Sequence, residues 1–468
     1  MVFSSIIFMF TFLPISLLIY YIVPKSFKNL VLLIISLIFY AWGEPIYVLL
    51  MMGTIVIDYT MALFIDKNKN NKLKRKVLFI FTVSVNILIL SFFKYYGFIV
   101  DNINIIFNLD IEIVKLALPI GISFYTFQTL SYIVDVYLEK VKVQKNLVSF
   151  ALYVTMFPQL VAGPIVKYSD IEEQLVNRNI DDIKFGKGVD RFIRGLAKKV
   201  LLANNIGIVW NLVQEMPIKE VSVVTSWIGI IAYTFQIYFD FSGYSDMAIG
   251  IGKMFGFEFM ENFNYPYIST SVTEFWRRWH ISLGGWFREY VYIPLGGNRV
   301  SIKRNIVNLF IVWMLTGLWH GASWNFVAWG TYYGAILLLE KTILKEILEK
   351  CPKVIKHTYT MLLVMVGWTL FGCENLQVAV QYLKVMFGLT QNVLIDSTAI
   401  YYLYTNIILL IVLTLCSTPI ISITLKNIMK ISNWYGVVFK IGISMTTVLL
   451  AVAYLVNETY NPFLYFRF

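Results

Sequence analysis

Two histidines lie among aromatic and basic side chains in a chain that is otherwise mostly hydrocarbon. His280 ends the segment Thr-Glu-Phe-Trp-Arg-Arg-Trp-His (273–280), and His320 lies in Thr-Gly-Leu-Trp-His-Gly (316–321). A neutral imidazole can accept the proton of a hydroxyl group while that hydroxyl attacks a carbonyl carbon. The chain has only 3 histidines, so the position of these two indicates chemistry performed inside a membrane.

The surroundings of His320 are almost uncharged. This residue follows one apolar run and precedes another, so we expect its ring to lie within the bilayer. An ionisable side chain at that depth is costly unless it is satisfied, which favours a functional role. The alternative is a histidine that bonds a backbone carbonyl in a helix bundle. Gly317 and Gly321 would allow substrate or backbone to approach closely, and Trp319 is expected to line the same space.

The segment around His280 reads as a helix with one broad apolar face. The aromatic and aliphatic positions follow helical spacing over two to three turns. They are Phe275, Trp276, Trp279, Leu283 and Trp286. The basic residues of the segment point mostly elsewhere.

Three arginines near His280 allow two interpretations. In the first, Arg277, Arg278 or Arg288 holds the phosphate or phosphopantetheine of an acyl donor, and Trp276 and Trp279 line the same site. In the second, the segment is an interfacial helix whose aromatic rings lie at the headgroup level and whose arginines bind lipid phosphate. The sequence leaves both open.

Two carboxylates, Asp240 and Asp246, lie near the end of one apolar run, in Tyr-Phe-Asp-Phe-Ser-Gly-Tyr-Ser-Asp (238–246). Six residues apart, they fall on different faces of a helix. Capping, or pairing with an arginine, is therefore at least as good an interpretation as catalysis. Segment 157–164 is expected to be a broken helix that shapes a cavity. His357, beside two lysines at a helix start, is expected to lie in an interfacial loop.

Composition excludes several classes of protein. Of the 468 residues, 58% are hydrophobic and 14% are charged, whereas soluble domains are about 25% charged. The net charge of +11 comes from short basic clusters between apolar runs, as in cytoplasmic loops, so we expect no nucleic-acid partner. The 3 cysteines have neither disulfide nor zinc-ligand spacing, and no metal is expected. Segment 3–23 is interpreted as a retained first span.

The apolar runs predict an all-α integral membrane protein. We expect about 11 crossings, with re-entrant and interfacial helices, in one membrane domain over residues 1–468 whose core motifs lie in 118–330. Segments 29–42, 148–166 and 306–319 are short or broken and are interpreted as half-helices. The predicted apolar segments are 3–23, 29–42, 46–65, 77–99, 115–137, 148–166, 190–213, 224–251, 306–319, 324–341, 357–372, 398–424 and 435–457.

The distribution of lysine and arginine predicts the orientation. The loop 66–76 is rich in lysine and is expected in the cytoplasm, and 101–114, which has acidic residues and no basic residue, is expected outside. Segments 253–304 and 341–356 are again expected inside. Counting spans from these loops places the N-terminus and residues 457–468 outside a bacterial cytoplasmic membrane.

Taken together, these segments resemble the membrane-bound O-acyltransferase family, and in particular its alginate O-acetyltransferase branch. The resemblance covers nearly the full length. Its motifs are Leu118–Gln128, Phe157–Ile165, Arg194–Lys199, Tyr238–Asp246, Phe275–Leu283, Tyr292–Arg299 and Gly317–Gly321.

The resemblance implies about 11 helices around a central tunnel, with His320 as the catalytic histidine and His280 as a second one. It also implies an acyl thioester donor, either acetyl-CoA or an acyl carrier, as substrate and no bound cofactor. The acyl group would be passed outward for O-acetylation of a surface exopolysaccharide or peptidoglycan. Expected partners are membrane lipid, an extracytoplasmic transferase of the SGNH hydrolase type, and a cytoplasmic acyl carrier.

Two other functions remain open on the sequence. One is D-alanyl transfer to teichoic acid from a carrier protein, which a relative in the wider family performs. The other is a non-enzymatic transporter of acyl groups or saccharides, in which the histidines would line a path. Transporters of that kind often contain inverted repeats, and this sequence contains no internal repeat.

Overall fold

The structure is a computed structural model that describes residues 1–468 except 115, 162, 432, 458–463 and 465–468. Over these described residues the regular structure is entirely helical. The chain divides into two compact units, one formed by Met1–Phe192 with Ser245–Met260 and the other by Ile193–Tyr244 with Glu261–Phe468. The prediction of one domain is not tested by this division.

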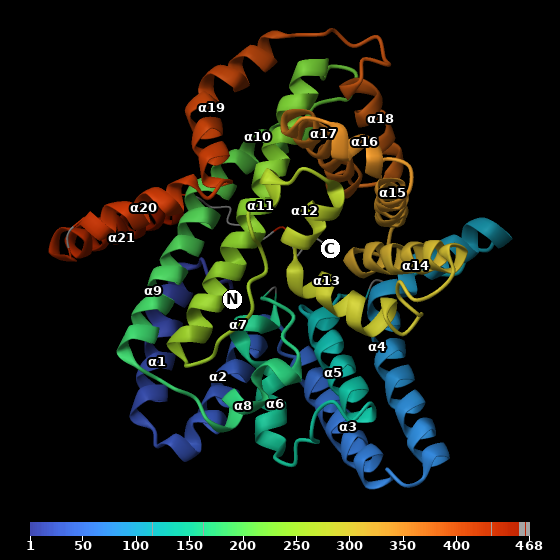
Figure 1. Cartoon of the computed structure of the whole chain (residues 1–468), viewed down its shortest axis with the longest axis vertical. Coiled ribbons are helices and arrows are strands. Elements are labelled where there is room, and N and C mark those ends of the chain that lie inside the picture. The colour runs from blue at the N-terminus through green and yellow to red at the C-terminus, as the bar shows by residue number, and fades with distance from the viewer. Residues whose placement is uncertain (115, 162, 432, 458–463, 465–468) are drawn as a thin grey trace. The chain divides into compact units, whose positions relative to one another are not determined.

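The first unit is a group of antiparallel helices in which α3 packs against α4 and α5, and α2 packs against α6 (Figure 1). The helices of the first unit are η1 (Phe8–Phe12), α1 (Leu13–Ile22), η2 (Lys25–Phe27), α2 (Lys28–Gly43), α3 (Tyr47–Lys67), α4 (Lys72–Phe107), α5 (Ile122–Tyr137), α6 (Leu147–Thr155), α7 (Phe157–Leu160) and α8 (Tyr168–Val176). Helices α9 (Asp182–Ala197) and α11 (Val223–Met254) contribute residues to both units.

The second unit contains the segments around both candidate histidines. Its helix α15 packs against α14, α12 and α17 (Figure 1). The helices of the second unit are η3 (Lys198–Asn204), α10 (Asn205–Glu215), η4 (Pro266–Ile268), α12 (Val272–Arg278), α13 (Ile281–Phe287), η5 (Arg288–Tyr292), α14 (Ile302–His320), α15 (Trp324–Lys341), α16 (Lys345–Lys350), α17 (Lys353–Gly372), α18 (Leu376–Met386), α19 (Ser397–Cys416), α20 (Ile420–Ile431) and α21 (Asn433–Asn457).

Six helices of the described residues are long and apolar enough to cross a membrane, which makes this a multi-pass membrane protein. One of them, Lys25–Gly43, was expected to be a half-helix. That prediction is wrong, because the helix begins before residue 29 and gains length there. The candidate spans are Lys25–Gly43, Tyr47–Lys67, Lys72–Phe107, Lys353–Gly372, Ser397–Cys416 and Gly436–Asn457.

Two predicted apolar segments are interrupted in the structure. Segment 148–166 is broken between α6 and α7, as expected from its proline and glycine residues. Segment 398–424 was expected to be continuous, but α19 ends at Cys416 and α20 begins at Ile420. Pro419 lies between them, and proline at this position cannot continue the backbone hydrogen bonds of α19.

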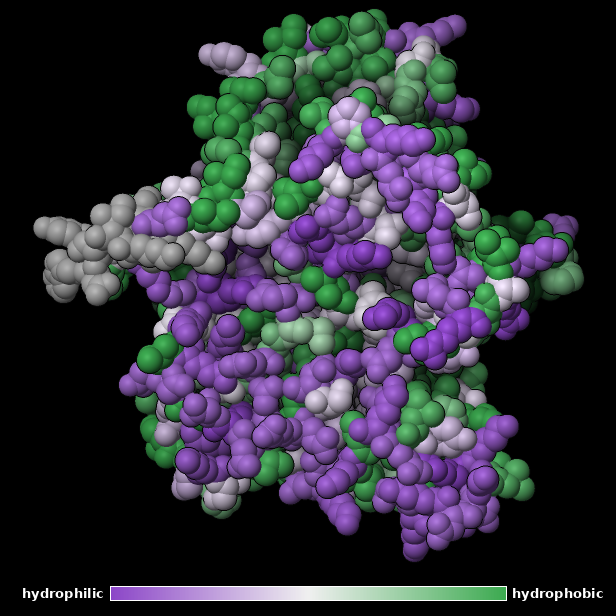
Figure 2. Space-filling view, in the orientation of Figure 1, coloured by the Kyte–Doolittle hydropathy of each residue, from purple (hydrophilic) through white to green (hydrophobic). Residues whose placement is uncertain are grey.

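The outer face of α19 is apolar. Ile400, Tyr404 and Ile408 lie one turn apart and are 63%, 81% and 76% exposed, and Figure 2 shows hydrophobic side chains over this helix at the upper end of the view. A contiguous apolar face of this kind in water would be unfavourable, whereas hydrocarbon solvates it without cost. We therefore interpret this face of α19 as a lipid contact.

Helices α14 and α15 approach each other closely at a pair of glycines, Gly317 and Gly330. A Cβ atom at Gly317 would collide with the backbone carbonyl oxygen of Phe326, and one at Gly330 would collide with that of Trp313. Small residues at such crossings are typical of membrane helices, where close packing replaces the hydrophobic effect. Gly317 was expected to allow close approach of substrate or backbone, and in the structure the approaching group is backbone.

We predict that Gly317→Ala destabilises the protein by about 1–3 kcal/mol, because a backbone carbonyl cannot move aside as a flexible side chain can. The matched control is Gly284→Ala in α13, where an added Cβ meets nothing within 4 Å and should stabilise the helix by up to about 1 kcal/mol. Thermal unfolding of the purified protein in detergent measures both. Equal melting temperatures for the two variants would contradict the close packing of α14 and α15.

Candidate active site

The segment 273–286 is not one helix, which corrects the prediction of a single broad apolar face. Helix α12 ends at Arg278, and His280 adopts the left-handed conformation with φ 45° before α13 begins at Ile281. This conformation is uncommon for a residue with a side chain and costs about 1–3 kcal/mol, so the surroundings must hold it. The break turns the His280 side chain away from the direction that it would have in a continuous helix.

Asn262 holds the break in place. Its backbone oxygen accepts a hydrogen bond from the Ile281 N–H at 3.0 Å, and its side-chain Oδ1 accepts from the Ser282 N–H at 3.2 Å and from Ser282 Oγ at 2.9 Å. A backbone N–H can only donate, so the atom that faces it must be the amide oxygen. The buried Asn262 side chain is therefore a fixed acceptor.

The same oxygen determines the tautomer of His280. Nδ1 of His280 lies 3.1 Å from Asn262 Oδ1, and because that oxygen only accepts, Nδ1 carries the proton and donates it to the bond. The lone pair of the neutral ring is then on Nε2. Burial lowers the pKa of His280 to about 3, so the ring is neutral at physiological pH. His280 is thus a neutral proton acceptor with its basic nitrogen defined.

His320 is the last residue of α14 and is buried in an aromatic cage. The centroid of its ring lies 5.1 Å from each of the ring centroids of Trp319, Trp329 and Phe371. The ring of Trp319 also lies 6.1 Å from the ring of His280, measured between centroids. Both imidazoles therefore pack against the same indole.

Trp276 and Trp279 belong to the same aromatic cluster. Trp276 packs edge-on against Tyr333 at 4.8 Å and against Trp329 at 5.3 Å between ring centroids. Trp279 is buried and lies 4.8 Å from Trp368. Edge-to-face contacts of this kind stabilise by about 0.5–1.5 kcal/mol each beyond their burial. These tryptophans tie α12 to α15 and α17 and leave little room for water around the histidines.

A buried carboxylate, Glu340 at the end of α15, holds the start of α12. One oxygen accepts from the Val272 N–H at 2.7 Å, and the other accepts from the Thr273 N–H at 2.8 Å and the Thr273 hydroxyl at 2.6 Å. The first N–H groups of a helix have no partner inside it and favour negative charge. Glu340 thereby fixes α12, which leads to His280, against the helix pair that carries His320.

The three arginines of the segment differ in their contacts. Arg278 is paired with Glu274 at 2.9 Å and donates to the Asn264 carbonyl at 3.1 Å. Arg277 and Arg288 are exposed. Arg278 thereby links the end of α12 to the segment before that helix.

The two carboxylates of α11, Asp240 and Asp246, have different partners and do not form one site. Asp240, in the second unit, makes a buried ion pair with Lys199 at 2.5 Å and accepts from the Leu464 N–H at 2.8 Å. Asp246, in the first unit, pairs with Arg191 at 2.6 Å. Both contacts match the interpretation of structural pairing, and one partner is an arginine as expected. Phe241, which follows Asp240, packs against the His280 ring at 4.7 Å.

Two residues of the site were missed in the sequence, Asn262 and Glu340. Glu340 carries a recognisable signal, because it is the first acidic residue after Glu289 and ends an apolar run, and a carboxylate at such a position calls for a partner. Asn262 carries no such signal in the sequence, because an asparagine in a polar loop is ordinary. Among the described residues, no three His, Cys, Asp or Glu side chains are grouped closely enough to hold a metal ion.

Comparison with known proteins gives concordant results. The model of the membrane-bound O-acyltransferase family matches residues 139–380, which include both histidines. The chain is similar to the probable alginate O-acetylase AlgI of Pseudomonas aeruginosa, with 44% identity over 392 residues that cover 83% of this chain and 75% of that protein. It is 35% identical to the peptidoglycan O-acetyltransferase of Helicobacter pylori over 424 residues, 83% of this chain and 80% of that one. The teichoic acid D-alanyltransferase of Bacillus subtilis matches at 27% over 232 residues, 47% of this chain and 58% of that protein.

We predict that Asn262→Asp moves the acid limb of the pH–activity profile to higher pH. A carboxylate beside Nδ1 favours the imidazolium, so the pKa of His280 rises from its depressed value of about 3. Below the new pKa the lone pair on Nε2 is lost and activity falls. In the wild-type protein His280 is neutral between pH 5 and 8 (about the physiological window for histidine) and contributes no titration there.

The matched control is Asn264→Asp, an exposed neighbour whose side chain lies outside this network. Its profile should be that of the wild-type protein. If Asn262→Asp and Asn264→Asp give the same acid limb, His280 takes no part in the pH-dependent step.

We predict that Glu340→Ala destabilises the protein by roughly 2–4 kcal/mol, because two N–H groups and a hydroxyl lose a charged acceptor in a buried place. Glu340→Gln should fall between this variant and the wild type, since one oxygen remains but the amide nitrogen faces a donor. Glu349→Ala, exposed on α16, is the control and should be neutral. Thermal unfolding in detergent measures all three, and a neutral Glu340→Ala would contradict the anchoring of α12.

Proposed function

Because the chain belongs to the membrane-bound O-acyltransferase family, we propose that it moves an acetyl group from a cytoplasmic thioester across the membrane for O-acetylation of a cell-surface polysaccharide. The named activities of the alginate and peptidoglycan O-acetylating relatives support an acetyl group and a sugar acceptor. The single observation that carries the proposal is the convergence of His280 and His320 on Trp319.

His320 is proposed as the general base. The oxygen of the acceptor hydroxyl attacks the thioester carbonyl carbon while the imidazole takes the hydroxyl proton. The tetrahedral intermediate then collapses, the C–S bond breaks, and the thiolate leaves and receives the proton. The aromatic cage supports this role because it excludes water, which would otherwise hydrolyse the thioester.

His280 is proposed to assist in proton transfer. Its Nδ1–H is engaged with Asn262, so its Nε2 accepts a hydrogen bond rather than donating one to a carbonyl. This geometry favours positioning of the attacking hydroxyl over polarisation of the thioester carbonyl. Exposed Arg277 and Arg288 are proposed to bind the phosphate groups of the donor, acetyl-CoA or an acyl carrier.

The finer topology follows as part of the same proposal. About 11 helices would surround a tunnel that connects the cytoplasmic donor with the external acceptor, and the lysine-rich turn between α3 and α4 would face the cytoplasm. The protein would reside in the bacterial cytoplasmic membrane with both termini outside. The proposed external end, 457–468, lies mostly outside the described residues. An extracytoplasmic transferase of the SGNH hydrolase type would receive the acetyl group.

We predict that His320→Ala lowers acetyl transfer by about 10²-fold or more, the usual loss on removal of a general base. Purified protein in liposomes with radiolabelled acetyl-CoA, the extracytoplasmic transferase and a soluble polysaccharide acceptor measures the rate. The controls are an unchanged elution profile on gel filtration and Lys350→Ala, exposed on α16, at full activity. A correctly folded His320→Ala protein with the wild-type rate would refute the assignment.

Analysis of the products separates this function from its alternatives. Mass spectrometry of the modified polymer distinguishes acetate from alanine, and so tests the D-alanyl transfer of the more distant relative. Flux of labelled sugar or acetate into sealed liposomes, without formation of an ester, would indicate a transporter instead.

A further inference from the structure

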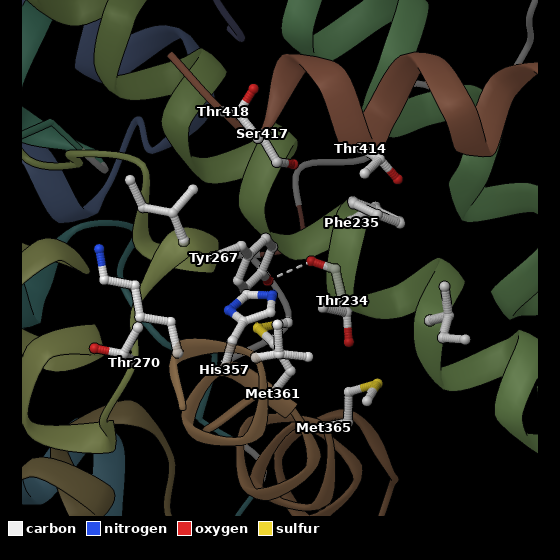
Figure 3. A pocket seen from close by; sticks show the side chains of 14 residues that line it. Thr234, Phe235, Tyr267, Thr270, His357, Met361, Met365, Thr414, Ser417 and Thr418 are labelled. Carbon is white, nitrogen blue, oxygen red and sulfur yellow. Dashed lines mark hydrogen bonds between the residues drawn. The ribbon is translucent and has the colours of Figure 1, made fainter. Parts of the chain in front are cut away.

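The second unit contains a cavity of about 570 Å³ that is lined by neither His280 nor His320. Its walls come from α11, η4, α17 and the C-terminal end of α19. Figure 3 shows α17 on one side, with His357 and Met361 directed toward Tyr267, and the end of α19 on the other. The volume lies within the range of roughly 300–1,000 Å³ that is usual for pockets that bind small molecules.

One face of α17 gives the cavity two chemically different ends. Lys353, His357, Met361 and Met365 line it at intervals of four residues, so they form a stripe about 18 Å long on this helix. The stripe begins with an ammonium group and an imidazole and continues with two flexible thioethers. His357, expected in a loop, lies in the second turn of α17, and its Nδ1 donates to the Ser269 carbonyl at 3.1 Å.

The hydroxyl groups of the lining do not make the interior polar. Thr234 donates to Ile230 O, Thr414 to Leu410 O and Ser417 to Leu413 O, each at 2.7–2.8 Å. These hydroxyls are hydrogen-bonded to carbonyl groups of their own helices, so mainly carbon atoms of the side chains face the cavity. The polar character is concentrated at Lys353 and His357, both of which are exposed.

We propose that this cavity binds one membrane phospholipid, with the acyl chain along Met361 and Met365 and the phosphate at the ammonium group of Lys353. Helices α17 and α19 are both long and apolar enough to cross the membrane. Lys353 begins α17, so its ammonium group lies at the end of a span, where lipid phosphates lie. Methionine adapts to irregular apolar ligands because its side chain is flexible and polarisable.

The charge of the lining favours a phospholipid over the thioester donor. A phosphate joined to a slender chain is common to a phospholipid and to coenzyme A. The lining provides one lysine and no arginine, which suits a single phosphodiester. Coenzyme A carries several phosphate charges and an adenine and would need more cations to replace its hydration.

The proposal is tested with the full-length protein in detergent micelles that contain a trace of phosphatidylglycerol bearing a diazirine in one acyl chain. After irradiation, mass spectrometry of peptides measures labelling at Met361 and Met365. Lys353→Glu should reduce labelling about tenfold, the loss expected for one charge-assisted hydrogen bond. Met361→Trp, which fills the cavity, should reduce labelling at Met365 at least as much.

The matched controls lie on the same helix outside the lining: Lys356→Glu for charge and Leu362→Trp, 40% exposed, for size. Both should label as the wild-type protein does. Equal labelling of Lys353→Glu and Lys356→Glu would overturn the proposal, and so would displacement of the lipid probe by an equal concentration of acetyl-CoA, which would assign the cavity to the donor. If Met361→Trp fails to fold, Lys353→Glu at the exposed mouth decides alone.

Discussion

Hydrocarbon offers no hydrogen bonds, so a polar group that this chain buries has to find its partner inside the protein. That constraint explains why the site is held by a few polar side chains with several bonds each. Glu340 accepts three hydrogen bonds at the start of α12. Asn262 Oδ1 accepts hydrogen bonds from Ser282 and His280, and Lys199 forms an ion pair with Asp240. Each of these bonds is also a positional restraint on a helix near the histidines.

Aromatic and glycine residues supply the close packing that surrounds these restraints. Gly317 and Gly330 let α14 and α15 come together, and the tryptophans of α12, α14 and α15 then fill the space around His320. The consequence for chemistry is a dry surrounding for two imidazoles. In such a medium a thioester is protected from hydrolysis, and desolvation disfavours the imidazolium, which keeps His280 neutral. The side chains that pack the helices are therefore the ones that surround the proposed catalytic histidines.

The two proposals assign the donor and the lipid to different basic residues. Exposed Arg277 and Arg288 present planar guanidinium groups, which suit the several phosphates of a thioester carrier. Lys353 lies at the mouth of an apolar cavity and suits a single phosphate attached to a chain. A bound lipid beside Tyr267, whose ring stacks on Phe275 of α12, would also fill a space next to the helix that leads to His280.

Much of this protein was readable in the sequence. Apolar run length predicted the long helices, as in 224–251 for α11 and 324–341 for α15, and the motifs around His280 and His320 predicted the family. The sequence could not determine the break at residues 279–280, because helical spacing of aromatic residues continues across it while the hydrogen bonds that stabilise it come from Asn262, 18 residues away. The sequence also could not show that both histidines pack against Trp319, or that Glu340 accepts a hydrogen bond from the Val272 N–H. Periodicity reports the local preference of the backbone, whereas these contacts join residues distant in sequence, and only tertiary packing decides which of them form.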